Sequence, residues 1–196
     1  MIDRPWAEVE GRRRPRAGTP GSRRRPGRLR GAALAAAAAL CGACGTAGAS
    51  GPVPAGATPS KAARMVCSAE AAGELADALG VRAAPSTATW VDHRYGCTYS
   101  YADGRIGLSV KELGDAAATT ADFAAEQAAL GAGGPVAGIG QGAYQASGGS
   151  IIVRKDYKVL SVDVSAVPAR FGAPPIDRSE AAVRVAIVVM GCWTDR

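Results

Sequence analysis

The fold is decided by residues 94–112, which read RYGCTYSYADGRIGLSVKE. Over residues 94–101 the larger side chains fall on alternate positions, so that one side carries Tyr95, Cys97, Tyr99 and Tyr101. After the turn dipeptide Asp103-Gly104, residues 105–112 alternate in the same way through Ile106, Leu108 and Val110. Alternation predicts half-buried strands, and a turn between two such runs predicts a β-hairpin.

Helices and further strands flank this hairpin. Apolar spacing and end signals predict a helix over 69–79 capped by Ser68, a strand near 87–91, a helix over 120–130, strands over 143–146, 150–155 and 158–165, and a helix over 177–192. Asp177 and Glu180 read as a capping-box pair. The glycine-rich segment 131–142 follows a helix and precedes a strand, which indicates a linker and not a phosphate-binding loop. The order α-β-β-β-α-β-β-β-α predicts an α+β fold, an antiparallel sheet of about five to six strands with packed helices.

An export signal precedes this domain. Residues 31–44 read GAALAAAAALCGAC and follow ten arginines. Their apolar core has the length of a secretory signal and falls short of the ~20 residues that a membrane span needs. We expect a cleaved signal peptide over 1–43 with a long arginine-rich start. Residues 44–64, rich in Gly, Ala and Pro, would form a disordered linker, and 65–196 a single extracytoplasmic domain.

The end of the signal resembles a bacterial lipobox. Small residues, Gly42 and Ala43, stand directly before Cys44. The resemblance implies that Cys44 becomes the acylated N-terminus, carrying chains such as palmitate and joining the protein to the membrane. Cys41 occupies a position where the pattern usually has an aliphatic residue. Plain signal-peptidase cleavage nearby is the alternative, and either the Sec or the twin-arginine route would fit.

The positive charge of the chain belongs to the predicted signal peptide. Residues 1–30 hold ten arginines against three carboxylates, a net of +7, whereas the whole chain carries +6. Everything after Arg30 therefore sums to −1. A nearly neutral domain lacks the basic surface that nucleic acids attract, so we expect no nucleic-acid partner.

Short motifs across 66–193 resemble small actinobacterial envelope lipoproteins of unknown function. They are Cys67 at the start of a helix, the Gly-Cys-Thr-Tyr strand around Cys97, the segment 138–144, and the closing Gly-Cys-Trp of Cys192 and Trp193. More loosely they are similar to the extracellular sensor domains of mycobacterial serine/threonine kinases. The resemblance implies an exported α+β domain and brings no reaction with it.

The cysteines of the domain are odd in number. With Cys44 lipidated, Cys67, Cys97 and Cys192 remain, and outside the cytoplasm two of them tend to oxidise. A Cys67–Cys97 bond, which would join the first helix to the hairpin, is the favoured pairing and leaves Cys192 free. If Cys44 is not lipidated, it could pair with Cys192 instead.

Catalytic signals are weak throughout. His93 and Cys97 lie about 13 Å apart along a strand, which is too far for a nucleophile and its base. One histidine and scattered carboxylates predict no metal site and no cofactor. Tyr95, Tyr99 and Tyr101 could line a ligand groove, or they could simply form the buried face of the sheet. We therefore expect a lipoprotein with a non-catalytic binding or scaffolding domain in the cell envelope, which binds another envelope protein, a small ligand or wall material. The alternatives are a secreted enzyme and an accessory subunit of a transporter or sensor.

Overall fold

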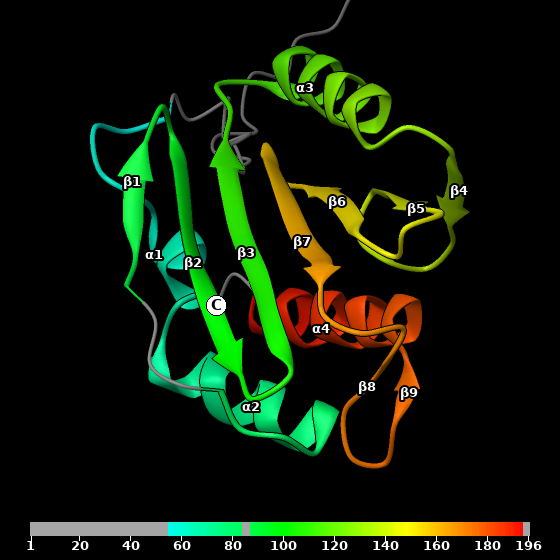
Figure 1. Cartoon of the computed structure of the whole chain (residues 1–196). Helices are drawn as coiled ribbons and strands as arrows, with labels where there is room; N and C mark the ends of the chain where they lie inside the picture. Colours follow the sequence, from blue (N-terminus) through cyan, green and yellow to red (C-terminus); the bar gives the residue numbers. More distant parts are fainter. Residues whose placement is uncertain (1–54, 84–86, 194–196) are drawn as a thin grey trace, which may run out of the picture. The chain divides into compact units, whose positions relative to one another are not determined.

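The computed structural model describes residues 55–83 and 87–193. The predicted signal peptide, Cys44 and part of the predicted linker lie outside these residues. Figure 1 shows the described elements. The helices are α1 (Lys61–Met65), α2 (Ala69–Leu79), α3 (Ala116–Leu130) and α4 (Arg178–Cys192). The strands are β1 (Thr89–Val91), β2 (Arg94–Tyr101), β3 (Gly104–Glu112), β4 (Gly133–Val136), β5 (Gly142–Ala146), β6 (Ile151–Lys155), β7 (Lys158–Ala166), β8 (Arg170–Phe171) and β9 (Ile176–Asp177).

Seven of these strands form one antiparallel sheet in the order β1-β2-β3-β7-β6-β5-β4. The predicted α+β fold is confirmed, and the order of helices and strands roughly follows the prediction. The sequence analysis did not predict α1, most of which lies within the predicted linker 44–64, or the short β8–β9 pair. The additional sheet strand is β4, which lies inside the glycine-rich segment predicted as a linker. Pro135 can occupy this strand because β4 forms the edge of the sheet, where one side of the backbone needs no strand partner.

The hairpin of β2 and β3 lies within the sheet as the sequence predicts. Its register runs from Arg94 opposite Lys111 to Tyr101 opposite Gly104, which leaves Ala102 and Asp103 as the turn. Gly104 thus opens β3 and has a φ of 147°. A Cβ on Gly104 would lie 2.2 Å from the carbonyl oxygen of Ala166, so the close approach of β3 and β7 at this end requires glycine.

The two faces of the sheet differ in character. The inner face, defined by Cys97, Tyr99, Leu108 and their neighbours, packs against α1, α2 and α4. Its core consists chiefly of buried aliphatic side chains, among them Val66, Leu75, Leu79, Val110, Leu160, Val162, Val185 and Val189. The outer face carries the alternate residues of the same strands and contacts α3 along one end.

The ends of the helices test the local predictions. Ser68 caps α2, since its hydroxyl accepts a bond from the Ala71 N–H at 3.1 Å, and Gly80 ends the helix with a φ of 67°. Asp177 stands at the N-cap of α4 without a side-chain cap bond. The predicted capping box is therefore wrong, because Asp177 pairs with Arg170 and the Glu180 carboxylate with Arg184.

Candidate functional site

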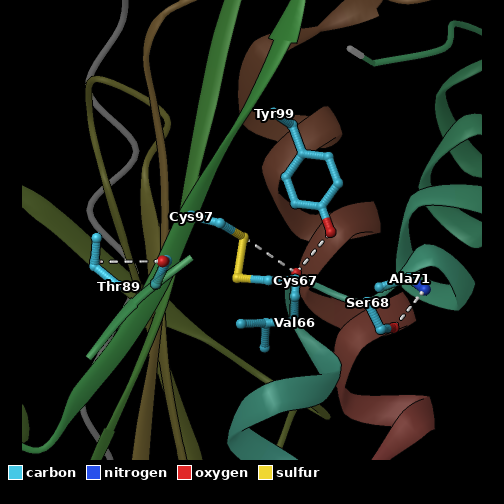
Figure 2. The surroundings of a disulfide bond; sticks show 8 residues. Val66, Cys67, Ser68, Ala71, Thr89, Cys97 and Tyr99 are labelled. Carbon is cyan, nitrogen blue, oxygen red and sulfur yellow. Dashed lines mark hydrogen bonds between the residues drawn. A yellow bond between two sulfur atoms is a disulfide. The ribbon is translucent and has the colours of Figure 1, made fainter. Parts of the chain in front are cut away.

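A disulfide joins Cys67, between α1 and α2, to Cys97 of β2. This is the pairing that the sequence favoured, with a Cα–Cα distance of 5.9 Å (Figure 2). Cys97 is buried, and its sulfur lies 3.6 Å from the Val66 carbonyl oxygen. A disulfide sulfur carries no proton to donate, so this approach is a packing contact. The bond also removes the thiol that a Cys97–His93 nucleophile would need.

The tyrosines proposed for a ligand groove extend along the inner face. Tyr99 is 2% exposed and its hydroxyl donates to the Val66 carbonyl oxygen at 2.7 Å (Figure 2). The Tyr101 ring packs edge to face on Phe171, with centroids 5.0 Å apart, and Tyr95 is half-buried. Burial raises the pKa of both Tyr99 and Tyr101 to about 12, with a smaller contribution from the neighbouring tyrosine in each case. Tyr99 and Tyr101 therefore belong to the packing of the core.

An open groove lies on the outer face of the sheet. It has a volume of about 380 Å³ and runs over β1, β2, β3 and β7. Its floor and walls consist mainly of small polar residues and glycine: Thr87, Thr89, Gly96, Thr98, Gly107, Ser109, Ser161 and Asp163. Figure 2 shows Thr89 on the side of β2 away from the disulfide. We call this site the outer-face groove.

Two glycines keep the floor of the groove low. A Cβ on Gly96 would come within 3.0 Å of the Ser109 Cβ, and a Cβ on Gly107 would lie 3.5 Å from the Asp163 Cβ. Larger side chains at Gly96 and Gly107 would therefore occupy part of the volume of the groove. A volume near 380 Å³ falls in the range of ~300–1,000 Å³ that small-molecule sites occupy.

The cations at the α3 end of the groove are already paired. The Arg94 guanidinium donates to the Ser109 hydroxyl at 3.1 Å and forms an ion pair with Glu126 of α3. The Lys111 ammonium, next to Arg94 across the β2–β3 pair, forms an ion pair with Asp122 of α3. These pairs neutralise the positive charge at this end and hold α3 over the sheet.

At the other side of the groove, Asp163 of β7 presents a carboxylate. Its Oδ1 accepts bonds from the Ser150 hydroxyl at 3.0 Å and from the Ser165 N–H at 2.9 Å. Partial burial would raise the pKa of Asp163, but the hydrogen bonds from Ser165 and Ser150 outweigh it and lower the pKa below its ordinary value. Asp163 is therefore charged at neutral pH, and the residues that the structure describes give it no ion pair.

The other candidate residues do not join this groove. His93 is exposed in the β1–β2 turn, with its ring edge to face against Trp90. Within the described residues, Cys192 is the cysteine that forms no disulfide. Burial raises the pKa of its thiol, and the negative charges of Glu70 and Glu74 raise it further. Over residues 55–83 and 87–193, no three potential metal ligands lie together. Cys44 lies outside the described residues, so its predicted lipidation stays a prediction.

The outer-face groove was not predicted by the sequence analysis. Its Gly, Ser and Thr residues occupy the polar half of each alternating strand, which is the half that usually faces water. A clue was available in Asp163, the one carboxylate within the alternating run of 158–165. Its position opposite Gly107 depends on the pairing of β3 with β7, which links distant segments.

The comparisons supply no relative. No protein-family model, no curated protein and no solved structure matches this chain. None of the helices in the described segments is both long and apolar enough to span a bilayer.

Proposed function

We propose that this chain is an exported lipoprotein, held at the extracytoplasmic face of the cell membrane by acyl chains on Cys44. Its domain is a non-catalytic binding module that takes a small polar ligand in the outer-face groove. The groove is the observation that carries the binding proposal, because it combines free volume with hydroxyl groups and a charged carboxylate.

Export has separate support. The arginine-rich start and the apolar run before Cys44 are typical of a signal peptide, and a disulfide such as Cys67–Cys97 persists in oxidising compartments. Two or three acyl chains at about 0.8 kcal/mol per buried methylene would make release from the membrane negligible. A linker beginning at Cys44 would then separate the domain from the lipid surface.

The binding interpretation is preferred over an accessory-subunit role on surface grounds. Docking to a membrane partner calls for a contiguous apolar patch. The large apolar side chains exposed within the described residues are Val91 on β1 and Ile187 on α4, which are on different elements. Single exposed residues of this kind need no partner to explain them.

The anchoring proposal is tested by labelling in a bacterial host that processes lipoproteins. The full chain is expressed with an alkyne-bearing palmitate, and label and membrane association are measured. We expect Cys44→Ala to lose both, whereas Cys41→Ala, three residues away, keeps both. Label retained in Cys44→Ala, or full-length chain in the cytosolic fraction of the unmodified protein, would contradict the proposal.

The binding proposal is tested by ligand-observed NMR of the purified protein against a small-molecule extract of the cell envelope. The groove is then blocked with Gly107→Leu, which places a side chain over its floor. Gly73→Leu on α2, where a Cβ meets no atom within 4 Å, is the matched control. We expect binding to be lost in the first variant and kept in the second. Equal binding by both variants would place the ligand elsewhere.

A further inference from the structure

The charges around the outer-face groove do not balance. Each of the two cations at the α3 end has an acidic partner on α3, Glu126 for Arg94 and Asp122 for Lys111. Asp163 has none among the residues that the structure describes. Arg105 is the next cation along the outer face of β3, and no ion pair joins it to Asp163. Asp163 is therefore the carboxylate of the groove lining that has no ion-pair partner among the described residues.

The Asp163 carboxylate is also held in place. The Ser150 hydroxyl, 3.0 Å away, and the Ser165 N–H, 2.9 Å away, both bind the same oxygen, Oδ1. Ser150 is itself buried and donates from a fixed position, since its hydroxyl oxygen also accepts the Val164 N–H at 3.2 Å. Both bonds to the carboxylate go to Oδ1, and the Ser165 side chain adds a further hydrogen bond that holds the carboxylate. An acceptor fixed in this way loses little conformational freedom when a donor binds it.

Further hydroxyl groups line the same groove as the carboxylate. Ser161 precedes Asp163 by two residues on the same face of β7, and Ser109 lies opposite Ser161 across the β3–β7 pair. Thr98 of β2 lies opposite Gly107 of β3, and Gly107 in turn lies opposite Asp163 of β7. Directly opposite residues on adjacent strands are about 5 Å apart and diagonal ones about 7–8 Å apart, whereas Thr98, two strands away from Asp163, is about 10 Å from it. A small ligand at Asp163 can therefore reach several of these hydroxyls.

We propose that the outer-face groove binds an aliphatic ammonium group at Asp163, with Thr98, Ser109 and Ser161 bonding the polar substituents beside it. This inference rests on the proposed binding function and specifies the chemistry of the ligand. An ammonium group carries three donors and one positive charge, which match the carboxylate and the hydroxyl acceptors around it. The amine could belong to an amino sugar or to the side chain of a peptide, and the test separates these sources.

The experiment compares amines with their acetylated forms, which keep the carbon skeleton and lose the charge. Purified full-chain protein in detergent is titrated with glucosamine and N-acetylglucosamine, and separately with Nα-acetyl-lysine amide and its Nε-acetylated form. We expect one of the two amines to bind at least about tenfold more tightly than its acetylated partner, since a hydrogen bond between charged groups is about twice as strong as one between neutral groups. The pair that shows the difference identifies the source of the amine.

Asp163→Asn then tests the residue. The asparagine side chain keeps an oxygen that can accept the bonds from Ser150 and Ser165. The negative charge is lost, and the second oxygen is replaced by an amide NH2 group, which donates and cannot accept a bond from an ammonium group. We expect the preferred amine to lose about tenfold or more in affinity, with thermal unfolding compared to check the fold. Asp77→Asn, the same change at an exposed position of α2, should leave the affinity within twofold.

Three results would overturn the inference: acetylated probes that bind as well as the amines, neither amine binding at millimolar concentration, or unchanged binding by a folded Asp163→Asn protein. The proposed function would survive each of them if a neutral ligand from the envelope extract still binds and Gly107→Leu still blocks it. It would fail only if that block has no effect or no ligand is found. The two failures are therefore distinguishable.

Discussion

Removing the Cys67–Cys97 disulfide should cost much of the stability of the domain. The two cysteines are 30 residues apart in sequence, and closing a loop of that length in the unfolded chain contributes about 4 kcal/mol at 25 °C on the chain-entropy model. Single domains are stable by only about 5–15 kcal/mol in total. The double variant Cys67→Ala/Cys97→Ala should therefore remain folded near room temperature with a greatly reduced margin.

The assay is urea unfolding followed by circular dichroism, on the double variant and on the unmodified protein with and without reductant. With a slope of about 2 kcal/mol per molar urea, the midpoint should fall by about 2 M. Reductant should lower the midpoint of the unmodified protein similarly and leave that of the double variant unchanged. Cys192→Ala, which removes the free thiol, is the control and should cost about 1 kcal/mol or less. A loss below about 1 kcal/mol in the double variant would refute the reasoning.

Three further predictions concern the inner face and the hairpin. Tyr99→Phe removes the hydroxyl that donates to the Val66 carbonyl oxygen at 2.7 Å. The free energy of unfolding, measured in urea, should therefore fall by about 1–3 kcal/mol. An unchanged value would mean that this hydrogen bond contributes nothing to stability. Because the pKa values of Tyr99 and Tyr101 are raised to about 12 from the ordinary value of 10.0, the unfolded chain loses these protons first, and stability should fall by about 2 kcal/mol per tyrosine as pH rises from 10 to 12. The urea midpoint measured from pH 10 to 12 checks this effect, and the fall in midpoint should be smaller in Tyr99→Phe. A midpoint that does not change with pH would contradict the prediction. Gly104→Ala places a Cβ 2.2 Å from the Ala166 carbonyl oxygen at a φ of 147°, and should lower the thermal midpoint far more than Gly114→Ala, where a Cβ meets nothing within 4 Å.

Local patterns in the sequence were sufficient for the hairpin, for α2 and for the disulfide partner of Cys67. The β2–β3 pair shows strict alternation over two strands, and α2 has both a serine cap and a glycine end. Local patterns were insufficient for the start of α3, which begins at Ala116 and not at Thr120 as predicted. Alanines have no distinct apolar periodicity, and the start is set by Asp115, whose carboxylate accepts the Ala118 N–H at 2.7 Å.

Tertiary pairing explains why the candidate site was missed. Asp163 meets Gly107 only because β7 pairs with β3, although the two strands are separated in sequence by α3 and three other strands. Glu126 neutralises Arg94 only because α3 crosses the outer face. Neither relation produces a periodic pattern within one segment of the sequence, so the groove carboxylate that has no ion-pair partner among the described residues becomes apparent only in the folded chain.

The central claim, that this is an exported and lipid-anchored domain, is tested most directly by mass spectrometry of the intact protein purified from membranes. We expect a mature chain that begins at Cys44, carries two or three acyl chains, and contains a Cys67–Cys97 bond with Cys192 reduced. A chain that retains the arginine-rich residues 1–43, lacks acyl groups and has all its cysteines reduced would contradict the account.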